Sequence, residues 1–397
     1  MGQARSYAVL AGCMVGAWGC GEGSTPALGP SVVDSAGIRI VSHPHAVMSN
    51  PWSVDADRAL TLEGDTDTPL FEIRGAVELA DGGVAVADGG NHRIVFYNPG
   101  GAIRFTTGRE GEGPGEFQRL GLLARGPADS LLVWDSQVRR VSVLAPTGEF
   151  TRSYSLETTD DVPFASVIAV YGDGSFLATG FVDTGGEPPG GGRRSYTVPS
   201  YHFSSEGAFR AASGNYSTGE SYFESVERGF SVFPALFASE AFRVPVQDQL
   251  LTATSDVYEL RYRARDGTTR MIVRREPRRR GVSAEARRAM MDALLEDARQ
   301  EQAERLEVVL AQQGVPEFLP ELSEIFADRL RRVWVREFEV PEAASMTWII
   351  YGGDGLQVGC LSLPAQFEPS DAGVDFVLGV MTDDFGVESV VRYALTK

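Results

Sequence analysis

The closest histidine pair in the sequence is His43 and His45, which are separated by one proline. On an extended segment both imidazoles would point to the same side and could begin a metal site. A zinc site needs further ligands, and no cysteine or third histidine stands near this pair. His92 falls in a predicted turn between two strands. We therefore expect structural roles for these histidines, and we assign no catalytic and no metal-ligating residue.

Aspartates stand at many of the predicted turns. Their carboxylates are hard oxygen ligands, which could hold calcium in a channel. The same residue type is a common turn former, because its side chain accepts hydrogen bonds from the backbone amides that follow it. We expect the turn-forming role and no cofactor, with calcium or another divalent ion as the alternative. These residues are Asp65, Asp67, Asp81, Asp88, Asp135, Asp173, Asp354, Asp383 and Asp384.

A cluster of arginines stands out against the acidic background of the chain. Such a cluster could dock anionic lipid headgroups or an acidic partner. We favour a simpler interpretation, in which these side chains are solvated near the start of a helical segment and pair with Glu285 and Asp292. The cluster consists of Arg274, Arg275, Arg278, Arg279, Arg280, Arg287 and Arg288.

The overall charge disfavours several classes of function. The 397 residues include 54 acidic and 36 basic side chains, and the formal net charge of −18 would repel a nucleic-acid backbone. The single lysine is Lys397, which excludes lysine Schiff-base chemistry and a lysine-containing phosphate loop. Hydrophobic residues make up 43% of the chain, which is enough for a sizeable core. We expect a globular protein with no nucleic-acid partner.

Residues 1–20 have the pattern of a targeting segment. Arg5 precedes an apolar stretch from Tyr7 to Gly19, which has the length of a signal-peptide core and is too short to span a bilayer. A small residue before a cysteine is typical of bacterial lipoprotein signals, so we predict that Cys20 is acylated, with Cys13 as the alternative. Residues 21–35 would form a flexible tether. A cleaved leader that gives a secreted protein and a mis-assigned start are the other interpretations.

The remaining cysteine content agrees with a lipoprotein. After processing at Cys20 the only other cysteine is Cys360, so no intramolecular disulfide can form between free thiols. Cys360 lies in the apolar run Val358–Leu363, and we expect it to be a small buried residue. The lipid would hold the protein in the cell envelope, at its periplasmic or extracellular face.

A strand–turn–strand unit recurs along the chain. In the first two copies, Asp88 and Asp135 open the inner turn and are 47 positions apart, as are the glycines Gly101 and Gly148 that close the following hairpin. Looser copies follow, so that the sequence predicts six units. Their strand pairs lie within residues 84–97, 131–144, 175–207, 249–267, 332–355 and 376–395.

The fifth unit is preceded by a segment of different composition, at about 281–314. Ser283 is a good N-cap, residues 284–313 are rich in helix formers, and Gly314 is a stop signal. Apolar residues recur there at helical spacing, which predicts a helix packed on the β body by one face. A solvated amphipathic arm and a dimerisation arm are the alternatives.

The units can form a closed ring if a strand from the start of the chain completes the last one. Either Ile38–Val41 or Leu60–Leu62 could pair with Val390–Tyr393. Closure would remove the exposed edges of the sheets. The predicted fold is therefore all-β, a six-bladed β-propeller over residues 36–397 with one α-helical insertion and an N-terminal signal segment.

The segment Val86–Ile94 resembles the NHL repeat, in which a strand is followed by Asp, Gly and then Asn-His-Arg-Ile. The linker Gly108–Phe117 resembles the glycine-rich connector of the same family, and the chain is similar to bacterial six-bladed propeller lipoproteins. The resemblance implies the propeller fold but not an activity, because propellers host several unrelated functions. From the six units, the predicted leader and the lack of a catalytic constellation, we expect a monomeric, membrane-tethered binding or interaction module with a protein, peptide or glycan partner, and we favour a non-enzymatic role. The alternative is a metal-dependent hydrolase or lyase with its site in the propeller channel.

Overall fold

The computed structural model describes residues 29–45, 50–65, 67–181, 191–226, 229–296, 298–341, 343–383 and 385–397. The predicted signal segment, Cys13, Cys20 and Asp384 lie outside these ranges. Within them, no helix is long and apolar enough to cross a membrane.

The described strands form six sheets, which we number I to VI in chain order. Sheet I contains β4 (Ile73–Glu78), β5 (Val84–Asp88), β6 (Arg93–Tyr97) and β7 (Ile103–Thr107). Sheet II contains β8 (Leu120–Arg125), β9 (Leu131–Asp135), β10 (Arg140–Leu144) and β11 (Phe150–Ser155), with the short 3₁₀ helix η1 (Pro127–Asp129) between β8 and β9. Sheet III contains β12 (Ser166–Val170), β13 (Phe176–Thr179), β14 (Gly192–Phe203), β15 (Phe209–Val226) and β16 (Gly229–Phe233).

The other three sheets follow the same antiparallel order. Sheet IV contains β17 (Ala241–Val246), β18 (Gln249–Thr254), β19 (Glu259–Arg263) and β20 (Thr269–Arg275), and is extended by β2 (Ile38–His43) and β1 (Ser31–Ser35). Sheet V contains β21 (Leu322–Ala327), β22 (Val333–Glu337), β23 (Ser345–Tyr351) and β24 (Gln357–Pro364). Sheet VI contains β25 (Phe367–Ala372), β26 (Phe376–Thr382), β27 (Glu388–Thr396) and β3 (Ser53–Leu62).

Each predicted strand pair supplies two adjacent strands of a different sheet. The turns explain why the pattern is recognisable. Asp88 is fully buried and accepts hydrogen bonds from Asn91 Nδ2 at 2.9 Å and from Arg93 Nε at 2.7 Å, so the Asp-x-x-Asn-x-Arg spacing ties a turn together. The hairpin glycines adopt positive φ angles, between +80° and +86°, which disfavour other residues. These glycines are Gly101, Gly148, Gly207, Gly267 and Gly355.

The sheets pack face to face in sequence, and sheet VI packs back on sheet I. Strand β4 contacts β8, β8 contacts β12, β12 contacts β17, β17 contacts β21, and β25 contacts β4, so the first strands of the sheets lie around a common axis. Five of the interfaces between neighbouring sheets hold a core of ten or more buried apolar residues each. The interface between sheets III and IV holds only three, Tyr171, Leu177 and Leu250.

The two predicted closing segments have different partners. Strand β3 pairs with β27, with Leu62 opposite Val390 and Leu60 opposite Arg392, which is the second of the two alternatives from the sequence. The first candidate, Ile38–Val41, lies in β2 and pairs in parallel with β20, where Ile40 is opposite Ile272. The first part of the chain therefore joins two separate sheets.

The predicted helical segment forms two helices, α1 (Ala284–Glu296) and α2 (Gln300–Gln312), instead of one. The chain breaks at Arg299, whose backbone is extended with φ −62° and ψ 136°. The hydroxyl of Ser283 accepts a hydrogen bond from the amide of Ala286 at 3.1 Å, as expected for an N-cap. Leu306 and Leu310 are buried against Leu236 and Phe237, in the turn that follows β16, so the helices pack by one apolar face as predicted, but mainly on this turn instead of on the face of a sheet.

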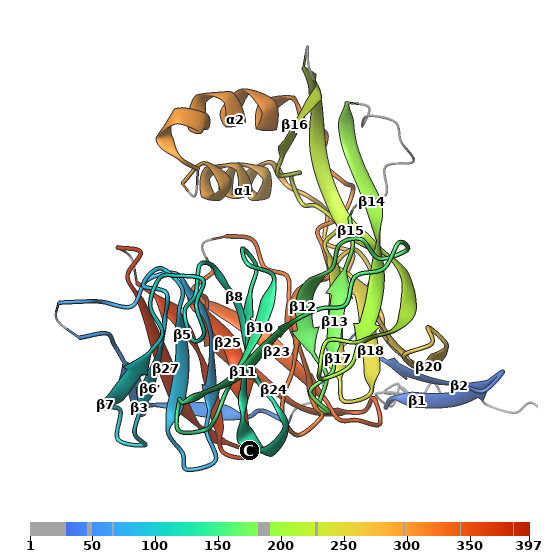
Figure 1. Ribbon diagram of the computed structural model, residues 1–397. Helices are drawn as coiled ribbons and strands as arrows, with labels where there is room; N and C mark the ends of the chain where they lie inside the picture. Colours follow the sequence, from blue (N-terminus) through green and yellow to red (C-terminus); the bar gives the residue numbers. More distant parts are fainter. Residues whose placement is uncertain are drawn as a thin grey trace, which may run out of the picture.

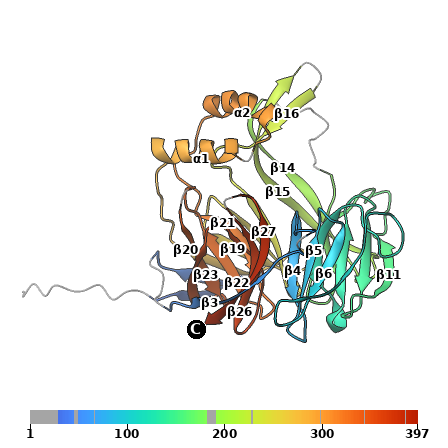
Figure 2. The ribbon, with the colours of Figure 1, turned by 90° about the vertical axis from the view of Figure 1, so that its left-hand side faces the viewer.

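Strands β14, β15 and β16 extend sheet III beyond the other sheets, and we call this ribbon the arm. Figures 1 and 2 show the arm rising on one side of the disc of sheets, with α1 and α2 on the same side. The 18 residues of β15 make it the longest strand described. The arm was not predicted from the sequence, because its strands are rich in polar residues and lack a regular apolar alternation.

Candidate functional site

The side of the disc that carries the arm and the helices, which we call the arm face, contains a chain of cavities. One of about 550 Å³ lies between the arm and the segment 314–320, and one of about 260 Å³ lies beside it. A third, of about 700 Å³, lies between β16 and the helices. The first two share Glu220, Phe237 and Ser255, and the last two share Pro234 and Leu294. We call these three adjoining cavities together the arm groove.

A fixed charged pair lines the arm groove. Arg193 of β14 forms an ion pair of 2.9 Å with Glu220 of β15 and donates hydrogen bonds to the carbonyls of Leu236 and Phe237. Glu220 Oε2 also accepts a hydrogen bond of 2.9 Å from the amide of Ser239. These bonds hold the arm to the segment that follows β16, and they fix the position of both charges. The pair therefore places one fixed positive and one fixed negative charge in the wall of the groove, with both terminal nitrogens of Arg193 bonded within the protein.

Apolar side chains remain exposed around the same groove. Phe318 is 37% and Val315 is 36% exposed, and both belong to the extended segment between α2 and sheet V. The guanidinium of Arg279 lies 6.0 Å from the ring centre of Phe318, and that of Arg305 lies 5.7 Å from the ring of Phe233. Aromatic rings with adjacent charged groups are typical of binding surfaces.

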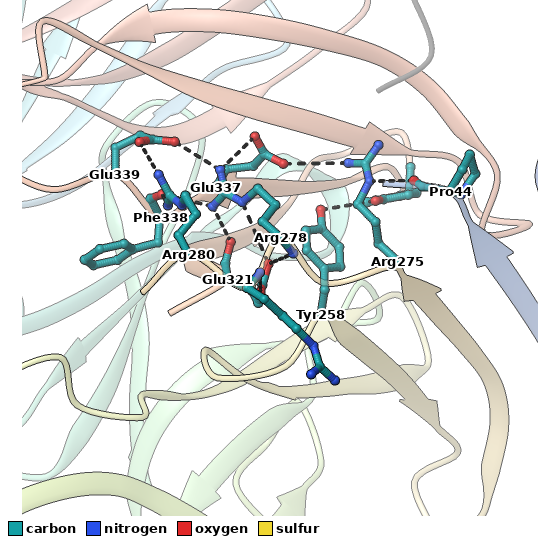
Figure 3. A network of polar contacts seen from close by, with 11 residues as sticks. Pro44, Tyr258, Arg275, Arg278, Arg280, Glu321, Glu337, Phe338 and Glu339 are labelled. Atoms are coloured by element: carbon teal, nitrogen blue, oxygen red, sulfur yellow. Dashed lines mark hydrogen bonds and ion pairs between the residues drawn. The ribbon is translucent and has the colours of Figure 1, made fainter. Parts of the chain in front are cut away.

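Part of the arginine cluster forms a network of ion pairs and hydrogen bonds with glutamates (Figure 3). The guanidinium of Arg278 lies 3.7 Å from Glu321, 3.4 Å from Glu337 and 3.0 Å from Glu339, and Arg280 pairs with Glu339 at 2.7 Å. The side chains of Arg278 and Glu321 are 14% and 5% exposed. The cluster thus ties the segment that leads into α1 to sheet V.

The prediction that this cluster pairs with Glu285 and Asp292 is wrong, because neither residue takes part in an ion pair between described residues. The glutamates that serve instead are distant in sequence and become neighbours only through the fold. Arg274 pairs with Glu259, and Arg287 donates to carbonyls at the carboxyl end of α2. Arg275 is buried between Tyr258 and the carbonyl of Pro44.

The histidines have structural surroundings. His43 is 2% exposed, and its Nε2 donates to the carbonyl of Gly355 over 2.9 Å. Burial lowers the pKa of His43, which favours the neutral ring. His45 is exposed beyond the end of β2, and His92 occupies its turn with φ 54°. In the described parts of the chain, no three His, Cys, Asp or Glu side chains are placed to hold a metal ion.

The turn aspartates bind backbone amides, as expected. Asp135 accepts a hydrogen bond of 2.9 Å from the amide of Gln137, and Asp383 accepts one of 2.8 Å from the amide of Val387. Asp173 binds Ser175 and Arg265; although burial alone would raise its pKa, these hydrogen bonds lower it to about 2. Similar bonds to following amides are made by Asp65, Asp81 and Asp354.

Sequence analysis missed an acidic group at the arm-face end of the inner strands. Glu324 of β21 pairs with Arg336 at 3.2 Å. Burial raises the pKa of Glu324 to about 7, and although Arg336 opposes this shift, the nearby carboxylates of Glu368 and Glu240 add to it. Only the topology places these glutamates together.

Cys360 was expected to be buried, but it is partly exposed on the outer strand β24.

Sheets of mostly four strands that pack face to face about one axis define a β-propeller. No family model matches the chain, and no curated protein sequence matches it.

The similar solved structures have low sequence identity. A DUF4221 family protein from Bacteroides vulgatus gives a TM-score of 0.54 at 13% identity, over 88% of this chain and 99% of that one. A Bacteroides fragilis protein that is provisionally named as exported gives 0.49 at 12% identity, over 90% and 99%. Virginiamycin B lyase from Staphylococcus aureus gives 0.42 at 11% identity, over 87% and 99%. At these identities the similarity concerns the fold alone.

Proposed function

We propose that this protein is an extracytoplasmic six-bladed β-propeller of the NHL-like type, attached to a membrane through a lipid on Cys20, that binds a protein, peptide or glycan in the arm groove. Each of the six described sheets serves as one blade in this proposal, and the pairing of β3 with β27 closes the ring. The helical pair is an insertion between the blades formed by sheets IV and V.

The location rests on the sequence of residues 1–20. Its apolar stretch is too short to span a bilayer, and it ends at a cysteine that follows a small residue. One lipid chain gives reversible membrane attachment, and additional acyl chains make the attachment stable.

The single observation that carries the binding role is the arm groove itself. Its cavities of about 550 Å³ and 700 Å³ have the size of ligand sites. They combine exposed apolar side chains with the fixed pair of Arg193 and Glu220. We do not extend the proposal to a metal-dependent hydrolase or lyase, because no described observation favours that alternative.

Photo-crosslinking can test this proposal. A photoreactive amino acid at Phe318 would report on the arm groove, and one at Val374 would serve as the control. Val374 is 65% exposed and follows the inner strand β25, at the end of that strand away from the arm face. In an envelope fraction we expect an adduct of discrete mass from position 318 and none from position 374. No adduct at 318, or the same adducts at both positions, would contradict the proposal.

A further inference from the structure

The interface between sheets III and IV differs from the other five because cationic side chains replace much of its apolar core. Its buried apolar residues are Tyr171, Leu177 and Leu250, whereas each of the other interfaces buries at least ten. A cavity of about 260 Å³ lies beside this small core. Arginines from two strands of sheet IV line it, together with Tyr216 and Ser217 of β15.

The strand register brings the arginines together. Arg243 of β17 is opposite Thr252 of β18, and Thr252 is opposite Arg261 of β19. Because side chains two positions apart on a strand share a face, Arg263 lies on the same side as Arg261. The three guanidinium groups therefore converge on one cavity, which we call the arginine cleft.

Few carboxylates neutralise this cleft. Glu259 is the one acidic residue in its lining, and it is shared between Arg261 and Arg274, each at 2.5 Å. Arg243 and Arg263 form no ion pair with any described residue. The Arg243 guanidinium has one long contact, of 3.5 Å, to the hydroxyl of Ser200.

Arg263 is held mainly by neutral groups. Its Nε donates to the Thr252 hydroxyl at 3.2 Å, and its Nη1 donates to the Thr269 hydroxyl at 3.2 Å and to the carbonyl of Gly267 at 3.3 Å. The Tyr216 ring lies 5.9 Å from the guanidinium carbon. These bonds orient the guanidinium but leave its charge without a counterion.

Charges that are withdrawn from water are normally paired. Two more deeply buried arginines follow this rule, since Arg93 pairs with Asp88 and Arg332 pairs with Asp328. Burial lowers the pKa of Arg243, in agreement with the lack of a carboxylate beside its guanidinium. A protein of net charge −18 could supply an acidic partner easily, so the unpaired arginines point to a partner from outside the chain.

We propose that the arginine cleft binds an oxyanion, the carboxylate, phosphate or sulfate group of a small ligand or of the end of a larger one. Guanidinium groups present paired donors in a planar fork that matches these groups. The volume of about 260 Å³ is small for a complete ligand and suits one anionic unit. This site is separate from the arm groove, and its test does not depend on the binding role proposed there.

Thermal unfolding with added sodium phosphate, sulfate or glucuronate, each against sodium chloride at equal ionic strength, tests this site. We expect a saturable rise in the unfolding midpoint with at least one of these oxyanions. A rise with phosphate or sulfate would indicate a site for a tetrahedral anion, and a rise with glucuronate would indicate a site for a carboxylate. Arg243→Met and Arg263→Met should each weaken the apparent affinity at least about tenfold, because each removes a charged donor.

Arg58→Met is the matched control, since Arg58 is exposed on β3 in sheet VI, and it should respond as the wild type does. A second measurement separates binding from folding: without oxyanion, Arg243→Met should unfold at the same temperature as the wild type or higher, because an uncompensated charge is removed. Equal oxyanion effects in all four proteins, no effect in the wild type, or a clear destabilisation by Arg243→Met alone would each overturn the proposal.

Discussion

Arg278 offers a direct test of how the helical pair is attached to the disc. It approaches Glu321, Glu337 and Glu339, and it donates hydrogen bonds of 3.0 Å to the carbonyls of Glu321 and Phe338. Replacing Arg278 by alanine removes all of these contacts at once. The Glu321 carboxylate, which is 5% exposed, would then have no guanidinium beside it.

The expected cost follows from that burial. Removing one partner of a buried ion pair costs about 3–5 kcal/mol, because an uncompensated charge remains. For a protein of this size such a loss lowers the thermal unfolding midpoint by roughly 5–10 °C. A double variant, Arg278→Met with Glu321→Gln, should recover part of the loss, because the most buried of the unpaired carboxylates is then neutral.

The assay is thermal unfolding followed by circular dichroism, with Arg279→Ala as the control. Arg279 is the next residue in the chain and has the same type, but it is exposed and forms no ion pair with described residues. We expect no measurable change for Arg279→Ala beyond the loss of its contact with Phe318. Equal midpoints for Arg278→Ala and Arg279→Ala would refute the role of the buried network.

Three further predictions concern other parts of the molecule. Because burial raises the pKa of Glu324 to about 7 from the 4.5 of the unfolded chain, its contribution to stability is greatest below pH 4.5 and falls as the pH rises to 7, by up to about 3 kcal/mol. In urea unfolding, the stability advantage of Glu324→Gln over the wild type should therefore be larger at about pH 8 than at about pH 5. An equal advantage at the two pH values would contradict this. Leu62→Ala should cost about 2–5 kcal/mol in urea unfolding, because Leu62 is fully buried where β3 closes the ring, whereas Arg58→Ala on the same strand should cost little; similar costs would argue against closure by β3. Cys20→Ser should abolish the lipid mass increment and release the protein from membranes, whereas Cys13→Ser should do neither; the reverse pattern would assign the lipid to Cys13.

The strand pairs could be predicted because their signals are local, whereas the closing strand could only be narrowed to two candidates, Ile38–Val41 and Leu60–Leu62. An aspartate, a short turn and an alternating strand specify each hairpin, and the positive φ of Gly148 or Gly207 allows few other residues. The helical segment could also be predicted, since Ser283 caps it and its apolar residues recur at helical spacing. Its division into two helices could not be predicted, because nothing in the composition around Arg299 marks the break.

The candidate site could not be predicted because its residues meet only through long-range contacts. Arg193 and Glu220 belong to the arm, whose polar strands lack the alternating apolar residues that predict a strand. Arg278 pairs with Glu337, which belongs to sheet V. The arginine cleft depends on the register that places Arg243 and Arg261 on either side of Thr252. For the arginine cluster, the acidic residues nearest in sequence were therefore the wrong prediction of its partners.

Hydrogen exchange of the intact protein, with and without the partner captured by crosslinking at position 318, tests the binding role most directly. The arm groove includes the amides of residues 314–320 and 231–239, and we predict that bound partner slows their exchange while the turn around Val374 is unchanged. Protection confined to the turns on the other side of the disc, or no protection at all, would contradict binding in the arm groove.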